Sequence, residues 1–369
     1  MRIVKVNKDS IANILSDLLK RSPTNYGDFQ DKVDAIIKNV RDNGDKAVFD
    51  YTAQFDKAEI NADNILVTEE EIKEAYEEVD DELIKVIRKA IKNIRDFHEK
   101  QIQKSWFETR EDGVMLGQKV TPMETCGVYV PGGKAVYPSS VLMNIVPAHV
   151  AGVKNIIMTT PPGKDGKVTA NTLVAAKEAG ATKVYKVGGA QAIAAMAFGT
   201  ESIPKVDKIV GPGNIFVALA KKAVYGNVSI DSIAGPSEIL VLADETANPR
   251  YVAADLLSQA EHDEMASAIL VTTSEELAHK VSDEIDGFLN QLSRKEIMEK
   301  SLDSFGYILV ASDMKEAIDT ANAIASEHME IMTANPFDVM TRIKNAGAIF
   351  IGAYSCEPLG DYFAGPNHV

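Results

Sequence analysis

Residues 155–187, with the sequence NIIMTTPPGKDGKVTANTLVAAKEAGATKVYKV, decide the fold class of this chain. Two short β-branched runs, 155–159 and 183–187, flank an alanine-rich run, 171–179, that stops at Gly180. Short β-branched runs are typical of buried strands, and an alanine-rich run that ends at a glycine predicts a helix. A strand, a helix and a second strand in this order predict a right-handed crossover between parallel strands.

The same alternation continues along most of the chain. Further strands are predicted at 207–210, 239–242, 268–272 and 307–310, and further helices at 249–261, 275–292 and 314–325. The first 105 residues are predicted to be mostly helical, with apolar spacing at 33–40, 47–55 and 83–97 and a turn at 43–44. Such units build a mostly parallel sheet covered by helices on both faces, and ligands are expected at the carboxyl ends of its strands.

Composition and charge exclude several classes of protein. The chain has 369 residues, of which 45% are hydrophobic and 25% charged, so it is long enough for two to three globular domains. A formal net charge of -15 makes nucleic acid an unexpected partner. Cys126 and Cys356 are too few for a disulfide framework or a cysteine-rich zinc site. Because no stretch approaches 18 uninterrupted apolar residues, no membrane association is expected, and the predicted location is the cytoplasm.

Glycines stand where three predicted strands end, in the loops 187–191, 210–214 and 234–238. Glycine allows the backbone to approach a ligand closely, although each loop taken alone is also typical of a tight turn. None of the loops contains G-x-G-x-x-G, so the usual dinucleotide fingerprint is absent. The three loops together favour a binding crevice. The polar residues that close them are available for hydrogen bonds at helix N-termini, and they are Gln191, Asn214 and Ser237.

Polar residues suited to metal binding or catalysis occur in three short segments. In SQAEHDE, Gln259 and His262 are three residues apart, a spacing that places both on one face of a helix. Such a pair is also typical of a solvated helix face. Glu327 and His328 follow a predicted helix, where a charge pair at the helix end is the alternative to a catalytic role. Asp361 adds a carboxylate near the end of the chain.

The motifs of the chain closely resemble those of histidinol dehydrogenase, over nearly the whole length. The segments that carry the resemblance are VYVPGG (128–133), VGGAQAI (187–193), GPGN (211–214), AGPSE (234–238), SQAEH (258–262), SEH (326–328), GD (360–361) and NHV (367–369). Several such segments in one order are far more specific than any of them alone.

The resemblance implies an α/β fold with two incomplete Rossmann-like domains, in which mostly parallel sheets are flanked by helices. It implies a helical N-terminal arm at 1–24, a first domain formed by 25–125 and 237–369, and a second domain at 126–236. Zinc and the catalytic residues are expected in the first domain and the NAD loops in the second. A homodimer is also implied.

The activity that the resemblance implies is the oxidation of L-histidinol to L-histidine through the aldehyde, with two NAD molecules and a zinc ion. This is the last step of histidine biosynthesis. By motif match, the expected zinc ligands are Gln259, His262 and Asp361. A mixed oxygen and nitrogen donor set suits an open, catalytic zinc site. His328 is expected to act as the base that accepts the hydroxyl proton, and Glu327 to activate water for the second oxidation.

Residues for cofactor and substrate binding also follow from the motif match. The NAD residues are expected to be Tyr129, Gln191 and Asn214, although Tyr129 beside Pro131 could equally be a packed aromatic residue. The substrate residues are expected to be Ser237, Gln259, His262, His328 and Asp361.

Members of the family extend well past the NHV motif, whereas this chain stops at Val369. In the family, that segment gives the partner subunit a zinc-binding histidine and a substrate-binding glutamate. The resemblance therefore implies zinc held by three ligands of one chain, impaired catalysis and a weakened dimer. Two other functions remain open: an NAD-linked zinc dehydrogenase of another small alcohol, and a non-catalytic homologue that binds NAD or a partner.

Overall fold

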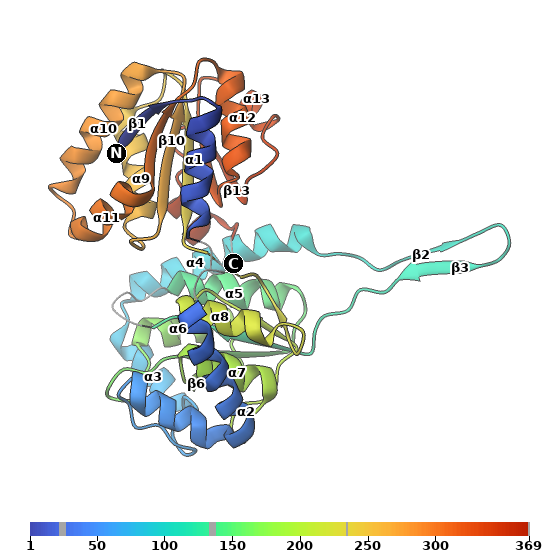
Figure 1. The fold of residues 1–369 in the computed structure, drawn as a ribbon. Helices are drawn as coiled ribbons and strands as arrows, with labels where there is room; N and C mark the ends of the chain where they lie inside the picture. The colour runs from blue at the N-terminus through green and yellow to red at the C-terminus, as the bar shows by residue number, and fades with distance from the viewer. Residues whose placement is uncertain (22–26, 133–137, 234, 368–369) are drawn as a thin grey trace. The chain divides into compact units, whose positions relative to one another are not determined.

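The computed structural model describes residues 1–21, 27–132, 138–233 and 235–367. They form two compact units, each with its own parallel sheet covered by helices (Figure 1). The first unit combines Met1–Asn25 with Gly235–Asp361, and the second combines Tyr26–Ala234 with Tyr362–Asn367. Two α/β units with mostly parallel sheets confirm the predicted fold class. Four residues of the predicted motifs lie outside the described part of the chain: Gly133, Ala234, His368 and Val369.

The sheet of the first unit is parallel throughout, in the order β1-β11-β10-β9-β12-β13. Its strands are β1 (Arg2–Lys5), β9 (Glu238–Ala243), β10 (Ser267–Thr272), β11 (Gly306–Val310), β12 (His328–Met332) and β13 (Ala348–Ile351). Alternate residues of β9 enter two separate cores, as in a sheet buried on both faces. One face is covered by α9 (Pro249–Ala260), α10 (Glu275–Leu289) and α11 (Lys295–Phe305), and the other by α1 (Lys8–Leu19), α12 (Met314–Ile324) and α13 (Pro336–Met340).

The sheet of the second unit is also parallel, in the order β6-β5-β4-β7-β8. Its strands are β4 (Thr125–Tyr129), β5 (Asn155–Thr160), β6 (Lys183–Lys186), β7 (Lys208–Val210) and β8 (Ser229–Ile230). One core involves α2 (Gly27–Phe55), α7 (Gly189–Phe198) and α8 (Ile215–Val224), and the other α3 (Glu69–Glu78), α4 (Asp81–His98), α5 (Pro138–Val150) and α6 (Ala170–Ala179). Within the described ranges, no helix is long and apolar enough to cross a membrane.

The two sheets share one strand order. Counted from β4 and from β9, the strands lie in the order 3-2-1-4-5, and β1 is added at the edge of the first sheet. This is the dinucleotide-binding order without its sixth strand, so each unit is an incomplete Rossmann-like domain. The winding direction reverses between β4 and β7, and again between β9 and β12. Such reversals create crevices at the carboxyl ends of the strands.

The unit boundaries differ from the predicted domain boundaries in three places, one of which is the segment Tyr362–Asn367, which belongs to the second unit and not to the first. Residues 26–125 belong to the second unit, because the apolar stripes of α2 and α4 pack on the helices of that unit rather than on those of the first unit. The predicted N-terminal arm is instead part of the first unit. Its β1 pairs with β11 as an edge strand, and Ile14 of α1 is buried in the core.

The break predicted at 43–44 is present as a kink within α2. Gly44 has φ of +55° and ψ of -135°, and the helix continues on both sides. A side chain at this position would be strained by the positive φ, and its Cβ would lie 2.4 Å from a carboxylate oxygen of Glu201. Glycine therefore allows α2 to bend where it meets the loop that contains Glu201.

A hairpin that was not predicted connects α4 to β4. The strands β2 (Trp106–Thr109) and β3 (Met115–Gln118) pair antiparallel (Figure 1). Every residue from 99 to 124 is exposed. The exposed side chains include Trp106, Phe107 and Met115, which are 51%, 67% and 67% exposed. A two-stranded hairpin is at best marginally stable by itself in water, and exposed apolar side chains of this kind are typical of interaction surfaces.

Candidate functional site

His328 is the centre of a buried polar cluster at the start of β12. Its side chain is 2% exposed. Nδ1 lies 2.9 Å from Oε1 of Gln259, and Nε2 lies 3.3 Å from Oδ2 of Asp361. The structure thus brings three predicted site residues together from three separate parts of the sequence.

Gln259 comes from the last turn of α9, a helix with Asn248 as its N-cap and Pro249 in its first turn. The helix ends at Ala260, so His262 lies in the following turn and not on the helix as predicted. The N–H of His262 donates to the carbonyl of Gln259 at 3.1 Å, a 3₁₀-type hydrogen bond. Because residues three apart in a 3₁₀ turn are eclipsed, the two side chains are still expected on one side.

Glu357 is a cluster residue that the sequence prediction did not include. The side chains of His328, Glu357 and Asp361 are buried and offer ligand atoms that all lie within 4.8 Å of one another. Glu357 belongs to the short helix α14 (Glu357–Leu359), and its N–H donates to Oε1 of the buried Glu330 at 2.9 Å. The spacing of four residues between Glu357 and Asp361 was the available signal. Carboxylates beside an imidazole form a donor set that suits zinc.

Burial and the neighbouring carboxylates shift the pKa of His328 in opposite directions. Burial lowers the pKa, but the hydrogen bond to Asp361 and the charges of Glu327 and Glu357 raise it, and the net pKa lies above the ordinary histidine value. A cation held by these carboxylates would offset their field and favour the neutral imidazole. The neutral ring is the form that can accept a proton.

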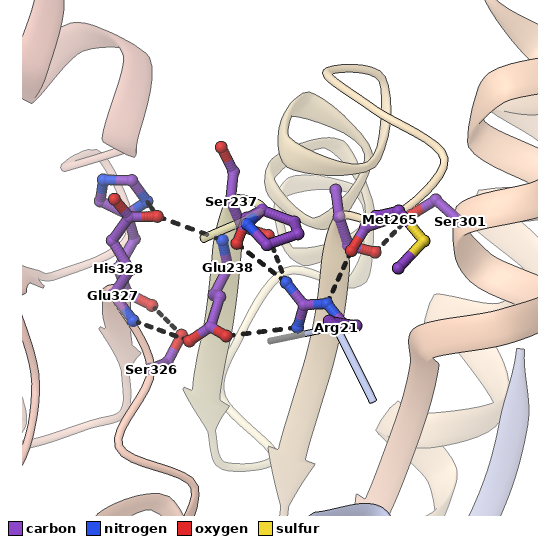
Figure 2. A network of polar contacts seen from close by, with 10 residues as sticks. Arg21, Ser237, Glu238, Met265, Ser301, Ser326, Glu327 and His328 are labelled. Atoms are coloured by element: carbon purple, nitrogen blue, oxygen red, sulfur yellow. Dashed lines mark hydrogen bonds and ion pairs between the residues drawn. The ribbon is translucent and has the colours of Figure 1, made fainter. Parts of the chain in front are cut away.

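Ser237, Glu238 and Glu327 belong to one polar network around Arg21 (Figure 2). The N–H of Glu238 donates to Oε2 of Glu327 at 3.3 Å, and the N–H of Glu327 donates to Oε2 of Glu238 at 3.4 Å. The same Oε2 of Glu327 lies 3.9 Å from Nδ1 of His328. Glu327 is therefore held beside the imidazole while its side chain remains 37% exposed.

The cluster lies at the amino ends of β9 and β12, where His328 pairs with Ile239. In this sheet the cluster thus lies at the end opposite to the carboxyl ends of the strands, where ligands were expected. The third glycine loop was expected to follow a strand, but 235–238 leads into β9, and the preceding strand β8 ends at Ile230. The segment lies where the chain passes from the second unit back to the first, which explains why it does not form a tight βα turn.

The second unit contains a cavity of about 770 Å³ at the carboxyl ends of its strands. Tyr129, Gln191 and Asn214, the predicted NAD residues, all line it. The Tyr129 hydroxyl accepts a hydrogen bond from the N–H of Gly189 at 3.2 Å, and burial raises its pKa to about 12. Gln191 is 1% exposed, and its Oε1 has no hydrogen-bond partner. Asn214 is the N-cap of α8.

The strand reversal between β4 and β7 forms one wall of this cavity. Gly211 follows β7 with φ of +120°, and a Cβ there would lie 2.0 Å from the carbonyl oxygen of Tyr129. Only glycine allows this approach of the two strand ends. Asp56, which the sequence did not predict as a site residue, also lines the cavity. Its Oδ2 has no hydrogen-bond partner, and burial raises its pKa to about 6.

Comparison with known proteins places these features in a family. The histidinol dehydrogenase sequence profile matches residues 19–369. The chain belongs to the histidinol dehydrogenase family. A histidinol dehydrogenase from Clostridium acetobutylicum is 60% identical over 334 residues, which are 90% of this chain and 77% of that protein. One from Bacillus subtilis is 58% identical over 367 residues, covering 99% of this chain and 85% of that protein.

A solved structure agrees with this assignment. The crystal structure of histidinol dehydrogenase from Elizabethkingia anophelis has a TM-score of 0.94 and 39% sequence identity, and the match covers 100% of this chain and 84% of that one. Membership makes the chain an oxidoreductase of the histidinol dehydrogenase type, as the motifs predicted.

Proposed function

We propose that the chain oxidises L-histidinol to L-histidine with zinc and two NAD molecules, in the last step of histidine biosynthesis. The observation that carries this proposal is the buried contact of His328 with both Gln259 and Asp361. The overall reaction converts one L-histidinol, two NAD⁺ and one water into one L-histidine with an ionised carboxylate, two NADH and three protons.

Zinc would be held by Gln259, His262 and Asp361, which offer two oxygens and one nitrogen. When bound, it supplies a positive charge that orients a polar substrate and lowers the energy of developing negative charge. The buried Asp361 carboxylate, 1% exposed, supports a cation at this place, because a buried carboxylate requires a compensating charge. Glu357 lies close enough to Asp361 to join the same site or to replace one of its ligands.

His328 would accept the hydroxyl proton of the alcohol as hydride passes to NAD⁺, leaving an aldehyde. The side chains of Gln259 and Asp361 hold the two ring nitrogens and so set the orientation of the imidazole. Glu327 would then take a proton from water as the water oxygen bonds to the aldehyde carbon. The hydrated carbon loses a second hydride to a second NAD⁺ and becomes the carboxylate.

NAD would bind in the cavity that Tyr129, Gln191 and Asn214 line. Hydrogen-bond donors of a nucleotide would satisfy Oε1 of Gln191 and Oδ2 of Asp56, both of which lack a partner. Buried acceptors without partners are costly unless a ligand supplies the missing donors. The cavity volume also lies in the range of small-ligand sites.

Replacing Asp56 by asparagine should stabilise the chain while weakening NAD binding. Because the folded pKa of Asp56 is raised from 3.8 to about 6, its ionised form destabilises the fold above about pH 6. After allowance for solvent screening, Asp56→Asn should raise the free energy of unfolding by about 1 kcal/mol at pH 7.5. The gain should fade as the pH falls below 6 and be absent below about 4. Urea unfolding at several pH values measures this difference.

The same variant should bind NAD about tenfold more weakly at pH 7.5, since one charged hydrogen-bond acceptor is lost. Calorimetric titration with NAD measures the affinity. Asp63→Asn is the matched control, because Asp63 is exposed and does not line the cavity. Equal NAD affinity in Asp56→Asn and the unaltered chain would remove Asp56 from the site.

We also propose that the chain forms a homodimer and that the hairpin β2–β3 contributes to its interface. Substituting both Phe107 and Met115 by serine should convert the dimer to a monomer at micromolar concentration. Each apolar side chain is worth about 1.5–3 kcal/mol when buried, and a symmetric dimer contains each of them twice. Light scattering after gel filtration measures the mass. Glu108→Ala on the same hairpin is the control, and a dimer that persists in the double variant would contradict the proposal.

The direct test of the proposed function is the product ratio. The purified chain with zinc, NAD and L-histidinol should form two NADH for each L-histidine. Higher rates with another small alcohol would favour the alternative dehydrogenase. NAD binding without NADH formation at saturating zinc would favour a non-catalytic homologue.

A further inference from the structure

Arg21 is a buried arginine that no motif singled out. It follows α1, its side chain is 2% exposed, and it donates hydrogen bonds to three backbone carbonyls (Figure 2). Nε donates to the carbonyl of Met265 at 2.7 Å, and Nη2 donates to those of Pro236 and Ser237 at 2.9 and 3.2 Å. Nη1 donates to Oε1 of Glu238 at 3.2 Å. One guanidinium therefore joins the segment after His262 to the segment that contains Ser237.

Glu238 extends this network to Glu327. Its Oε1 accepts from Arg21, and its Oε2 accepts from the N–H of Glu327. Its own N–H donates to the Glu327 carboxylate. Because both carboxylate oxygens of Glu238 are engaged, Arg21 limits the positions that Glu238 can take, and Glu238 in turn limits those of Glu327. The chain of contacts ends at the carboxylate that lies 3.9 Å from His328.

Only arginine has the shape that this network requires. The guanidinium is planar and carries five N–H donors in a fixed fork, which matches several acceptors around one plane. A lysine ammonium would keep the charge, but with three donors on a single nitrogen it could not serve all four acceptors. A purely stabilising role would need only the pairing of a buried charge. Contact with the segment of Ser237, with the residue that follows the segment 258–264 and, through Glu238, with Glu327 indicates a more specific role.

We infer that Arg21 and Glu238 are positioning residues that hold Glu327 for the water-dependent second oxidation. The inference rests on the proposed function, in which Glu327 acts only after the aldehyde has formed. Loss of the network should therefore slow the second NADH much more than the first. General destabilisation would slow both in the same proportion.

The test is a single-turnover experiment with zinc-loaded chain in excess over L-histidinol and with saturating NAD. The unaltered chain should form two NADH per substrate. Glu238→Ala leaves the carbonyl acceptors of Arg21 in place, so the first NADH should form at a rate within about threefold of the unaltered chain. The second should slow by about tenfold to a hundredfold, because small misplacement of a reacting group has effects of this size.

Arg21→Lys should slow the second NADH at least as strongly as Glu238→Ala, since it removes the support of Glu238. In a Glu327→Gln background, Glu238→Ala should cause no further slowing of the second NADH, as expected for residues that act through one group. Ser301→Ala is the matched control. Ser301 is buried, and its hydroxyl donates to the carbonyl of Ala266 at 2.9 Å, next to Met265, rather than to one of the acceptors of Arg21. It should leave the ratio of the two rates unchanged.

Four results would overturn the inference. If Glu238→Ala slows both NADH phases equally, or neither, Glu238 does not position Glu327. If Glu238→Ala slows the second phase equally with and without Glu327, it acts by another route. Absence of NADH from the unaltered chain would instead contradict the proposed function, and the inference with it. Glu238→Ala tests the network even if Arg21→Lys does not fold.

Discussion

Replacing His328 by alanine should reduce NADH formation from L-histidinol by about 10²–10⁴-fold, the usual contribution of a positioned general base. The imidazole is buried and oriented by Gln259 and Asp361, so water cannot readily replace it in the same geometry. The loss should be in kcat, because proton transfer occurs in the transition state. Steady-state NADH absorbance at saturating zinc and NAD measures it.

His279→Ala is the control for His328→Ala, since His279 is exposed on α10. Its activity should match that of the unaltered chain. The His328 variant must also be folded and zinc-loaded for the comparison to hold, and circular dichroism and metal analysis establish this. Activity within threefold of the unaltered chain would remove His328 from the proton-transfer step.

Replacing Asp361 by alanine should weaken zinc binding by at least about 100-fold. The substitution removes a ligand atom and the buried negative charge that compensates the cation. Loss of a residue that only supports a ligand typically lowers metal affinity by about 10–100-fold, so loss of a ligand itself should lower it at least as much. Competition with a chromogenic chelator measures the zinc affinity independently of catalysis. Addition of excess chelator to the unaltered chain should likewise abolish NADH formation.

Asp303→Ala is the control for Asp361→Ala, because it removes the same charge from an exposed position on α11. Its zinc affinity should equal that of the unaltered chain. If Asp361→Ala binds zinc as tightly as Asp303→Ala, Asp361 is not a zinc ligand. Zinc would then have to be held elsewhere in the protein.

The sequence predicted the parts of the fold that depend on local pattern. Alternating strands and helices from residue 126 onward were recognisable because each buried strand reads as a β-branched run. The shared 3-2-1-4-5 order and the edge strand β1 follow from long-range pairing, which leaves no local pattern. The hairpin β2–β3 was missed because its side chains are exposed on both faces, so it lacks the apolar alternation of a half-buried strand.

In the candidate site, too, some residues could be recognised from the sequence and others only from the structure. Gln259, His328 and Asp361 stood out as polar residues in family motifs, and the structure brings their side chains together. Glu357 and Arg21 carried no comparable motif. Glu357 is important because α14 turns it towards His328 and Asp361, and Arg21 because its acceptors come from distant segments. Such roles depend on tertiary contacts that residue spacing does not encode.

Two sets of side chains that include Asp361 could bind the zinc ion. One is the predicted set with Gln259 and His262, and the other is the compact cluster with His328 and Glu357. Only the first leaves His328 available as the base. A crystal of the zinc-loaded chain, measured at the zinc absorption edge, distinguishes them most directly. We expect one anomalous peak bonded to Gln259, His262 and Asp361, with the His328 ring outside the coordination shell. A peak bonded to His328, or no peak at Asp361, would contradict it.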